Sequence, residues 1–249
     1  MKKRKYELSN ECIEWCGRKL YRIRSLIDRT SDIKVGTLGG YVESEKNLSQ
    51  DGCCWIYDNA KVAGNARVER YAKIRGNTII DECAVITDYA DVNGDIFVGG
   101  NARISEYAHV SGSYEIHGAV RIHGHAKLSG GCISIYDRVE IDEEVEMSGC
   151  FELNGDSKIC GDAIINSASD FCIIRGFGLQ YDEIMFVRSK KYNVAVFCDD
   201  WGYISINKFR NEVRKKYKKT MQGKDYIMLA EVMEHKLLST TKPWREEYA

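Results

Sequence analysis

An aliphatic residue returns at every sixth position between residues 56 and 128. These positions are Ile56, Val62, Val68, Ile74, Ile80, Ile86, Val92, Val98, Ile104, Val110, Ile116, Ile122 and Leu128. After one extra residue the spacing resumes at Ile135, Ile141, Met147, Leu153, Ile159 and Ile165. Because a helix repeats every 3.6 residues, six-residue spacing does not stay on one helical face, and short strands are favoured. A fixed period of this kind predicts a repeat architecture.

Each six-residue repeat places a small residue two positions before the branched one, as in Ala66 and Val68. Residues two apart face the same side of a strand, so both members of the pair point into one narrow core. Glycines such as Gly64 and Gly76 follow two residues after the branched position, where a bend with positive φ costs glycine little. The pattern predicts a hexapeptide-repeat parallel β-solenoid in a mainly β protein.

A second period of 18 residues relates Tyr71, Tyr89, Tyr107 and His125. Three repeats therefore close one coil, and equivalent residues stack at about 4.8 Å per coil. The 19 repeats correspond to roughly six coils on this spacing. The four side chains form a predicted surface column that either binds bases or a protein partner or only stabilises the stack.

The chain divides into three predicted regions. Residues 1–47 form an N-terminal β cap, which protects the open solenoid end from edge-to-edge pairing. Residues 48–170 form the solenoid, and residues 171–249 form an α+β region in which the six-residue spacing is lost. Residues 183–188 and 192–197 read as a β-hairpin around Ser189-Lys190-Lys191.

Two helices are predicted after the hairpin. Asn207 is the expected N-cap of the first, which carries Phe209, Val213 and Tyr217 on one stripe. The second runs from about residue 225 to residue 238. Its apolar stripe is Tyr226, Ala230, Met233 and Leu237.

Ten cysteines raise the question of disulfides or metal binding. The four in the repeats, which are Cys83, Cys132, Cys150 and Cys160, replace residues of ordinary size and are expected to be free thiols. Neither Cys12 and Cys16 nor the adjacent Cys53 and Cys54 have the paired spacing of a zinc site. No metal and no cofactor are predicted.

Charge is unevenly distributed although the net charge is only −1. The acidic residues gather late in the solenoid, and the tail is basic. The basic tail surface comprises Lys208, Arg210, Arg214, Lys215 and Lys218. It is either a surface for nucleic acid or an acidic partner, or a solvated helix face.

The chain lacks an apolar stretch long enough to span a bilayer, and its basic start lacks the core of a signal peptide. A cytoplasmic location without membrane contact is expected.

Two segments carry a resemblance to a known family. They are residues 57–66 (YDNAKVAGNA) and the lead-in at residues 38–43 (LGGYVE). The chain resembles the polymer-forming-type hexapeptide-repeat proteins of phages and prophages, which share YDNAxVxGNAxV coils. The resemblance implies a left-handed β-helix and a phage setting, the host cell cytoplasm included, in which small accessory proteins often antagonise host defence.

The alternative function is a hexapeptide-repeat acyltransferase that uses acyl-CoA and a histidine as general base. The candidate histidines are His109, His117, His123 and His125. Against it, residues 56–128 lack the loop that usually builds the acceptor pocket, and three of these histidines hold outward positions where any polar residue is accepted.

The expected function is therefore a non-enzymatic, phage-type binding protein that engages a host protein or protein–nucleic acid complex. It would act as an antagonist of antiviral defence, such as an anti-CRISPR-like inhibitor. Its expected binding residues are Tyr71, Tyr89, Tyr107, His125, His123 and His117. We expect a homo-oligomer, a trimer rather than a dimer; a self-assembling structural scaffold is the second alternative.

Overall fold

The computed structural model describes residues 4–177 and 182–239. The expected fold class is confirmed: a parallel β-solenoid of about seven turns precedes a small sheet and two helices. The count exceeds the predicted six because β3 (Leu38–Val42), from the expected cap, already pairs in parallel with β5 (Lys61–Val62). Contacts group the chain into two compact units, Met1–Glu143 with Phe151–Lys158, and Glu144–Cys150 with Ile159–Ala249.

The first unit begins with an antiparallel hairpin. Strand β1 (Tyr6–Trp15) pairs with β2 (Arg18–Ser25), and β2 pairs antiparallel with β3. Because β3 also pairs with a coil, one sheet runs from the hairpin into the solenoid. A short 3₁₀ helix, η1 (Glu45–Asn47), follows, and the Asn47 side chain donates to the carbonyl of Ala66 at 2.9 Å.

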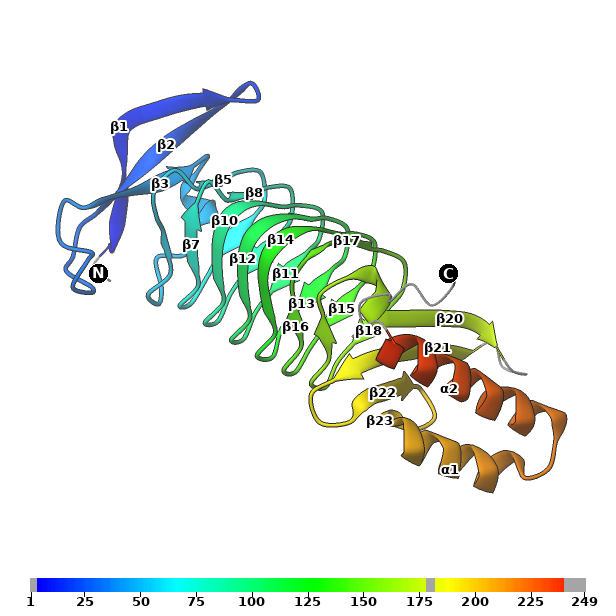
Figure 1. Ribbon diagram of the computed structural model, residues 1–249. Helices are drawn as coiled ribbons and strands as arrows, with labels where there is room; N and C mark the ends of the chain where they lie inside the picture. Colours follow the sequence, from blue (N-terminus) through cyan, green and yellow to red (C-terminus); the bar gives the residue numbers. More distant parts are fainter. Residues whose placement is uncertain (1–3, 178–181, 240–249) are drawn as a thin grey trace, which may run out of the picture. The chain divides into compact units, whose positions relative to one another are not determined.

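The coils are stacked in parallel, as Figure 1 shows for the strands from β5 to β14. One face is a separate sheet in the order β6, β9, β11, β13, β15, β18, where β18 is Lys158–Ile159. Its strands are β6 (Arg67–Val68), β9 (Val85–Ile86), β11 (Arg103–Ile104), β13 (Arg121–Ile122) and β15 (Glu140–Ile141). The other strands of the coils are β4 (Trp55–Ile56), β7 (Lys73–Gly76), β8 (Ile79–Ile80), β10 (Asp91–Val98), β12 (His109–Ile116), β14 (Lys127–Ile135), β16 (Glu146–Met147), β17 (Cys150–Leu153) and β19 (Ile164–Ile165).

The core follows the six-residue pattern. The branched residues that point inward, such as Val68, Ile86 and Ile104, have no exposed surface, and neither have small partners such as Ala66 and Ala84. Burying each aliphatic side chain contributes about 1.5–3 kcal/mol, so the stack is stabilised evenly along its length.

One corner of three successive coils departs from the pattern. There the strands β10, β12 and β14 continue around the corner, with glycines at φ 139° (Gly94) and 133° (Gly112). Bulky residues replace the usual alanine, among them the buried Tyr114, whose hydroxyl donates to the carbonyl of Gly130 at 3.0 Å. Burial raises the pKa of Tyr114 to about 12.

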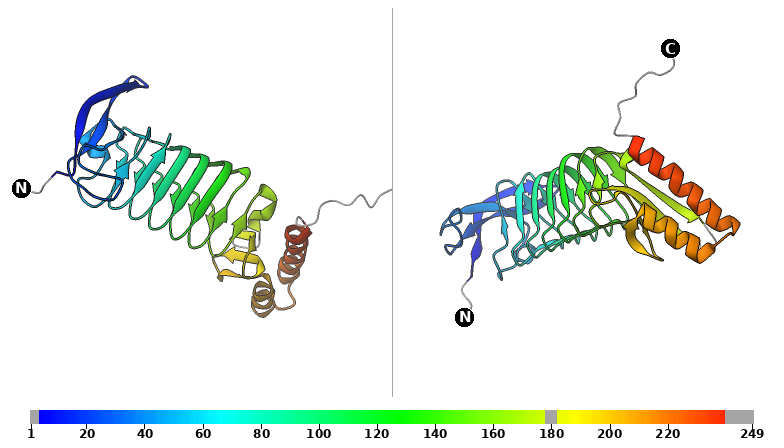
Figure 2. Two further views of the ribbon diagram at one scale, coloured as in Figure 1. Left: turned by 60° about the vertical axis from the view of Figure 1, so that its left-hand side comes forward. Right: turned by 60° about the horizontal axis from the view of Figure 1, so that its bottom comes forward.

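The second unit contains an antiparallel sheet in the order β20 (Phe171–Phe177), β21 (Asp182–Ser189), β22 (Asn193–Cys198), β23 (Gly202–Ser205). The short helix η2 (Ala168–Asp170) precedes it. Strands β21 and β22 form the expected hairpin, since Ser189 pairs with Asn193. Figure 2 shows the two helices that follow, α1 (Ile206–Tyr217) and α2 (Met221–Ser239).

Most residues of the expected helix stripes are buried, with Phe209, Val213 and Tyr226 in one apolar cluster, and Tyr217 and Met233 pack against this cluster partly buried. The expected N-cap is wrong by two residues. Ser205 caps α1, and its side chain accepts from the amide of Lys208, whereas Asn207 lies in the first turn. A serine oxygen satisfies a free amide at a helix start as well as asparagine does, so residue type alone did not decide between them.

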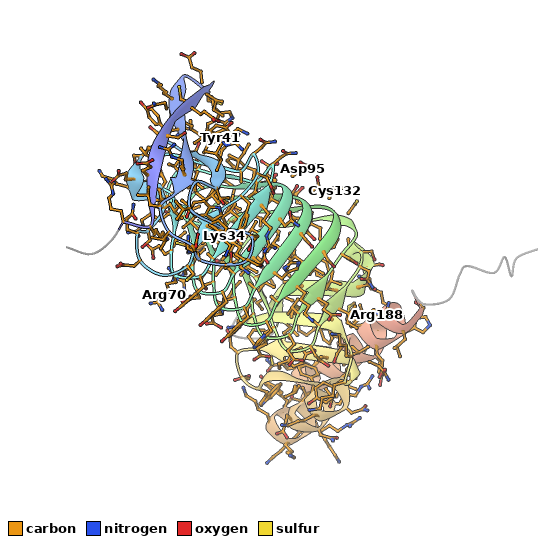
Figure 3. The ribbon with its side chains drawn as sticks, turned by 90° about the vertical axis from the view of Figure 1, so that its left-hand side faces the viewer. Lys34, Tyr41, Arg70, Asp95, Cys132 and Arg188 are labelled. Atoms are coloured by element: carbon orange, nitrogen blue, oxygen red, sulfur yellow. The ribbon has the colours of Figure 1, made fainter. Side chains whose placement is uncertain are left out.

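The expectation of free thiols is wrong for two cysteines. Cys132 and Cys150 are disulfide-bonded, whereas Cys83, Cys160 and the other six cysteines are not in a disulfide. Cys132 is exposed and lies at an edge of the coils (Figure 3).

None of the helices in residues 4–177 and 182–239 is long and apolar enough to cross a membrane.

Candidate functional site

The predicted aromatic column exists as an unbroken stack, here called the aromatic ladder (Tyr71, Tyr89, Tyr107 and His125). Its ring centroids are 4.7, 5.0 and 4.8 Å apart, and successive rings are within 4° of parallel. The three tyrosines are about half exposed. They lie at the turn that follows β6, β9 and β11, so the ladder marks one corner of the coils.

Stacking determines what the ladder can offer a ligand. The faces of neighbouring rings already cover each other, so a base cannot enter between them unless the coils separate. Apart from the outer faces of the first and last rings, a ligand can reach only the edges of the rings and the tyrosine hydroxyl groups. A role of these residues in binding stays a prediction, and it applies to the edges of the rings.

His123 lies two residues before the end of the ladder and is surrounded by carboxylates. Its Nδ1 is 3.0 Å from Asp142 and 4.0 Å from Glu106, and its Nε2 is 3.3 Å from Glu140. The side chain is 22% exposed, so the ring is held by the fold but is open to solvent on one side. Each ring nitrogen of His123 therefore has a carboxylate oxygen within hydrogen-bonding distance, Asp142 for Nδ1 and Glu140 for Nε2.

The carboxylates are themselves fixed. Asp142 accepts from the amide of Glu143 at 2.6 Å, and Glu106 accepts from the amide of Gly124 at 3.0 Å. Lys158 donates to Glu140 at 2.7 Å and is the main reason that the pKa of Glu140 lies below its usual range. Glu140 therefore stays ionised beside the imidazole.

Ligand atoms of His123, Glu140 and Asp142 lie within 4.8 Å of one another, which is close enough to hold a metal ion. Two oxygens and one imidazole nitrogen suit several divalent cations. The ammonium group of Lys158 on Glu140 opposes this use, because it places a positive charge next to the position of the cation.

The structure separates the other candidate histidines from this cluster. His117 follows a strand of a different face, where its Nε2 lies 3.1 Å from Glu82. His109 starts β12 and is in register with Asp91. His125 is the last ring of the ladder and is exposed. Of the expected site residues, His123 and His125 thus lie together with the ladder, whereas His117 does not.

The basic tail surface lies on α1 and directly after it. Arg210 is mostly buried and bonds Glu234 on α2 at 2.6 Å, and Lys215 pairs with Glu212 at 2.8 Å. Lys208, Arg214 and Lys218 are exposed. Pairing removes part of the positive field expected from the sequence, and binding of nucleic acid or an acidic partner here stays a prediction.

The sequence pattern did not identify Glu140 and Asp142 as the partners of His123. The signal that could have identified them is that both lie one coil after the strand that precedes His123. Asp142 follows His123 by 19 residues instead of 18, because this coil contains the extra residue, and strict counting in eighteens therefore misses the pair.

No model of a known protein family matches the chain. A stretch of 85 residues is 36% identical to the uncharacterized acetyltransferase YdcK of Escherichia coli (strain K12). The match covers 31% of this chain and 26% of that protein.

This similarity corrects the functional expectation. The main hypothesis, a non-enzymatic phage-type binding protein that antagonises antiviral defence, is wrong, because the similar protein is named an acetyltransferase and nothing indicates defence antagonism. The similarity favours the alternative that the sequence left open, a hexapeptide-repeat acyltransferase. The phage setting has no support in the comparisons.

Proposed function

We propose that the protein is an acyltransferase that moves an acyl group from acyl-coenzyme A to a hydroxyl or amine acceptor in the cytoplasm. The observation that carries the proposal is His123, held 3.0 Å from Asp142 on an accessible part of the solenoid. The local similarity to an acetyltransferase supports the reaction class.

In the proposed reaction His123 is the general base. Its Nε2 takes the proton of the acceptor as the acceptor oxygen or nitrogen attacks the thioester carbonyl carbon. The carbon–sulfur bond then breaks, and the thiolate of coenzyme A takes the proton back from the imidazolium. Asp142 holds Nδ1 and stabilises the positive charge that the ring acquires.

Glu140 lies where the acceptor must approach, 3.3 Å from Nε2. Because Lys158 holds its other contact, we expect Glu140 to turn towards Lys158 when the acceptor binds. The ionised carboxylate then accepts a hydrogen bond from the acceptor and orients it.

The test is release of free coenzyme A thiol from acetyl-coenzyme A with a panel of amine and hydroxyl acceptors, with mass spectrometry of the acylated product. We expect His123→Ala to lower kcat on the order of 10²–10⁴-fold, the usual contribution of a general base. Asp142→Asn should lower kcat less and leave the KM for acetyl-coenzyme A unchanged.

His109→Ala is the matched control, since it removes a histidine on another face of the same coils. Turnover that survives His123→Ala, or an equal loss in the His109 variant, contradicts the assignment of the base. Absence of acyl transfer to every acceptor, with a protein that melts cooperatively, contradicts the proposed function itself.

A further inference from the structure

The outer surface of the sheet formed by β11 and β13 carries two arginines side by side. Arg103 and Arg121 are in register on neighbouring parallel strands, so their Cα atoms are about 4.8 Å apart. Both side chains are exposed and alternate with the buried Ile104 and Ile122. Like charges directly opposite each other destabilise a sheet.

This pair is unusual among the arginines of the coils. Residues 48–170 contain six arginines, and four of them have a carboxylate partner. These are Arg67, Arg70, Arg75 and Arg138. Among the residues that the structure describes, neither Arg103 nor Arg121 has one. Glu140 is in register with Arg121, but its carboxylate lies against Lys158 and His123 instead.

The pair lies next to the proposed base. Arg121 precedes His123 by two residues, which on a strand corresponds to about 6.6 Å between their Cα atoms, with both side chains on the outer face. Two guanidinium groups that lack a partner in such a position suit a phosphate or carboxylate, which arginine binds through paired N–H groups.

We propose that Arg103 and Arg121 bind an anionic group, phosphate or carboxylate, of the acyl acceptor. This inference rests on the proposed function and specifies its substrate class. The acceptor is favoured over coenzyme A as the source of the anion. The pantetheine arm keeps the phosphates of coenzyme A away from its thioester, whereas this subsite is adjacent to the base.

The first readout does not depend on acyl transfer. Inorganic pyrophosphate is titrated calorimetrically into the wild-type protein and into Arg103→Gln, Arg121→Gln and the control Arg67→Gln. We expect binding that weakens roughly tenfold in each of the first two variants, equal to about 1.4 kcal/mol, and is unchanged in the third. Equal binding by all four proteins overturns the proposal, even if acyl transfer is found.

The second readout assigns the anion. Acceptors are offered in pairs with and without their phosphate or carboxylate, and acetyl-coenzyme A is compared with acetyl-dephospho-coenzyme A. We expect Arg103→Gln and Arg121→Gln to raise the KM of the anionic acceptor and to leave kcat and the KM of the acyl donor unchanged. A raised KM for acetyl-coenzyme A that disappears with the dephospho donor overturns the assignment to the acceptor. Failure of all acyl transfer with pyrophosphate binding intact rejects the proposed function and retains the anion subsite.

Discussion

The turns of the coils show how single residues define this fold. Positive φ recurs every six residues, at glycines such as Gly64 and Gly100 and also at acidic residues such as Glu106. Left-handed backbone costs a non-glycine residue about 1–2 kcal/mol. Several acidic side chains offset this cost by accepting from the backbone amide 18 residues later, as Asp58 does from Gly76 at 3.0 Å.

Where glycine holds such a turn, we expect the next coil to exclude any side chain. A Cβ added at Gly100 would lie 2.6 Å from backbone atoms of Gly118, whereas one added at Gly130 would meet nothing within 4 Å. Both residues have positive φ, 66° and 71°. Gly130→Ala should therefore cost about 1 kcal/mol of stability and Gly100→Ala roughly 3 kcal/mol or more. Thermal unfolding followed by circular dichroism measures both, and equal losses would show that strain rather than the clash dominates.

The repeat pattern predicts the turns and the ladder but not the contacts of His123. The glycine turns and the ladder follow from spacing, because equivalent positions one coil apart must stack. The partners of His123 do not follow so directly, because the extra residue after Leu128 shifts each later column by one. That Glu140 contacts Lys158 and not Arg121 depends on side-chain rotamers, which no repeat pattern determines.

Among the elements, the N-terminal hairpin contacts the coils of the first unit through side chains as well as through its sheet. Arg18 at the start of β2 bonds Asp81 in a coil at 2.8 Å, and its guanidinium lies 4.9 Å from the centre of the Trp15 ring. The Arg18 hydrogen bond is the main cause that lowers the pKa of Asp81, and Asp81 is nearly buried. The Arg18–Asp81 ion pair therefore holds the turn end of the hairpin against a coil.

This ion pair predicts that the stability of the protein depends on pH. Because the pKa of Asp81 is depressed in the folded state, its contribution is complete above its unfolded pKa of about 3.9 and is lost as the pH falls through the folded value. Asp81→Asn should lower stability by about 1–2 kcal/mol at pH 7, and the difference from wild type should shrink as the pH falls below the unfolded pKa. Thermal unfolding at pH 7, 4 and 2 checks this, with Glu115→Gln, at an exposed carboxylate, as control. A difference that is independent of pH would contradict the role of the charge.

Element types were predictable because each has its own apolar period: six in the coils, alternation in the hairpin of β21 and β22, and a helical stripe in α1. The long corner strands were not predictable in the same way. There the buried Tyr114 occupies a position that alanine fills elsewhere, so the repeat pattern does not predict the path of the chain at this corner.

At the scale of the whole molecule, the proposed reaction requires a site that is closed to water, which an open face of a single chain does not provide. Acyl thioesters react with water, so the transfer site must be shielded during the reaction. His123 lies on a surface that leaves its ring 22% exposed in a single chain. We propose that a second copy of the chain covers this face in a closed homotrimer.

Light scattering coupled to size exclusion checks the oligomeric state at micromolar concentration. We expect a single species of three times the 28.4 kDa chain mass. A monomer that transfers acyl groups at the full rate would contradict the shielding role of a partner. Fibres would instead support the structural scaffold, and a stable dimer would contradict the trimer.

The single extra residue after Leu128 has a consequence for how such a chain can change in length. Most coils pair residues 18 apart, as Arg103 and Arg121 do, whereas Arg121 and Glu140 pair across 19. Whole coils can therefore be gained or lost by evolution or design without disturbing any column, and a one-residue insertion is absorbed at the Gly130–Gly131 corner. Such a corner works as a register adjuster: it determines which residues of the later coils face the proposed base, without altering the core.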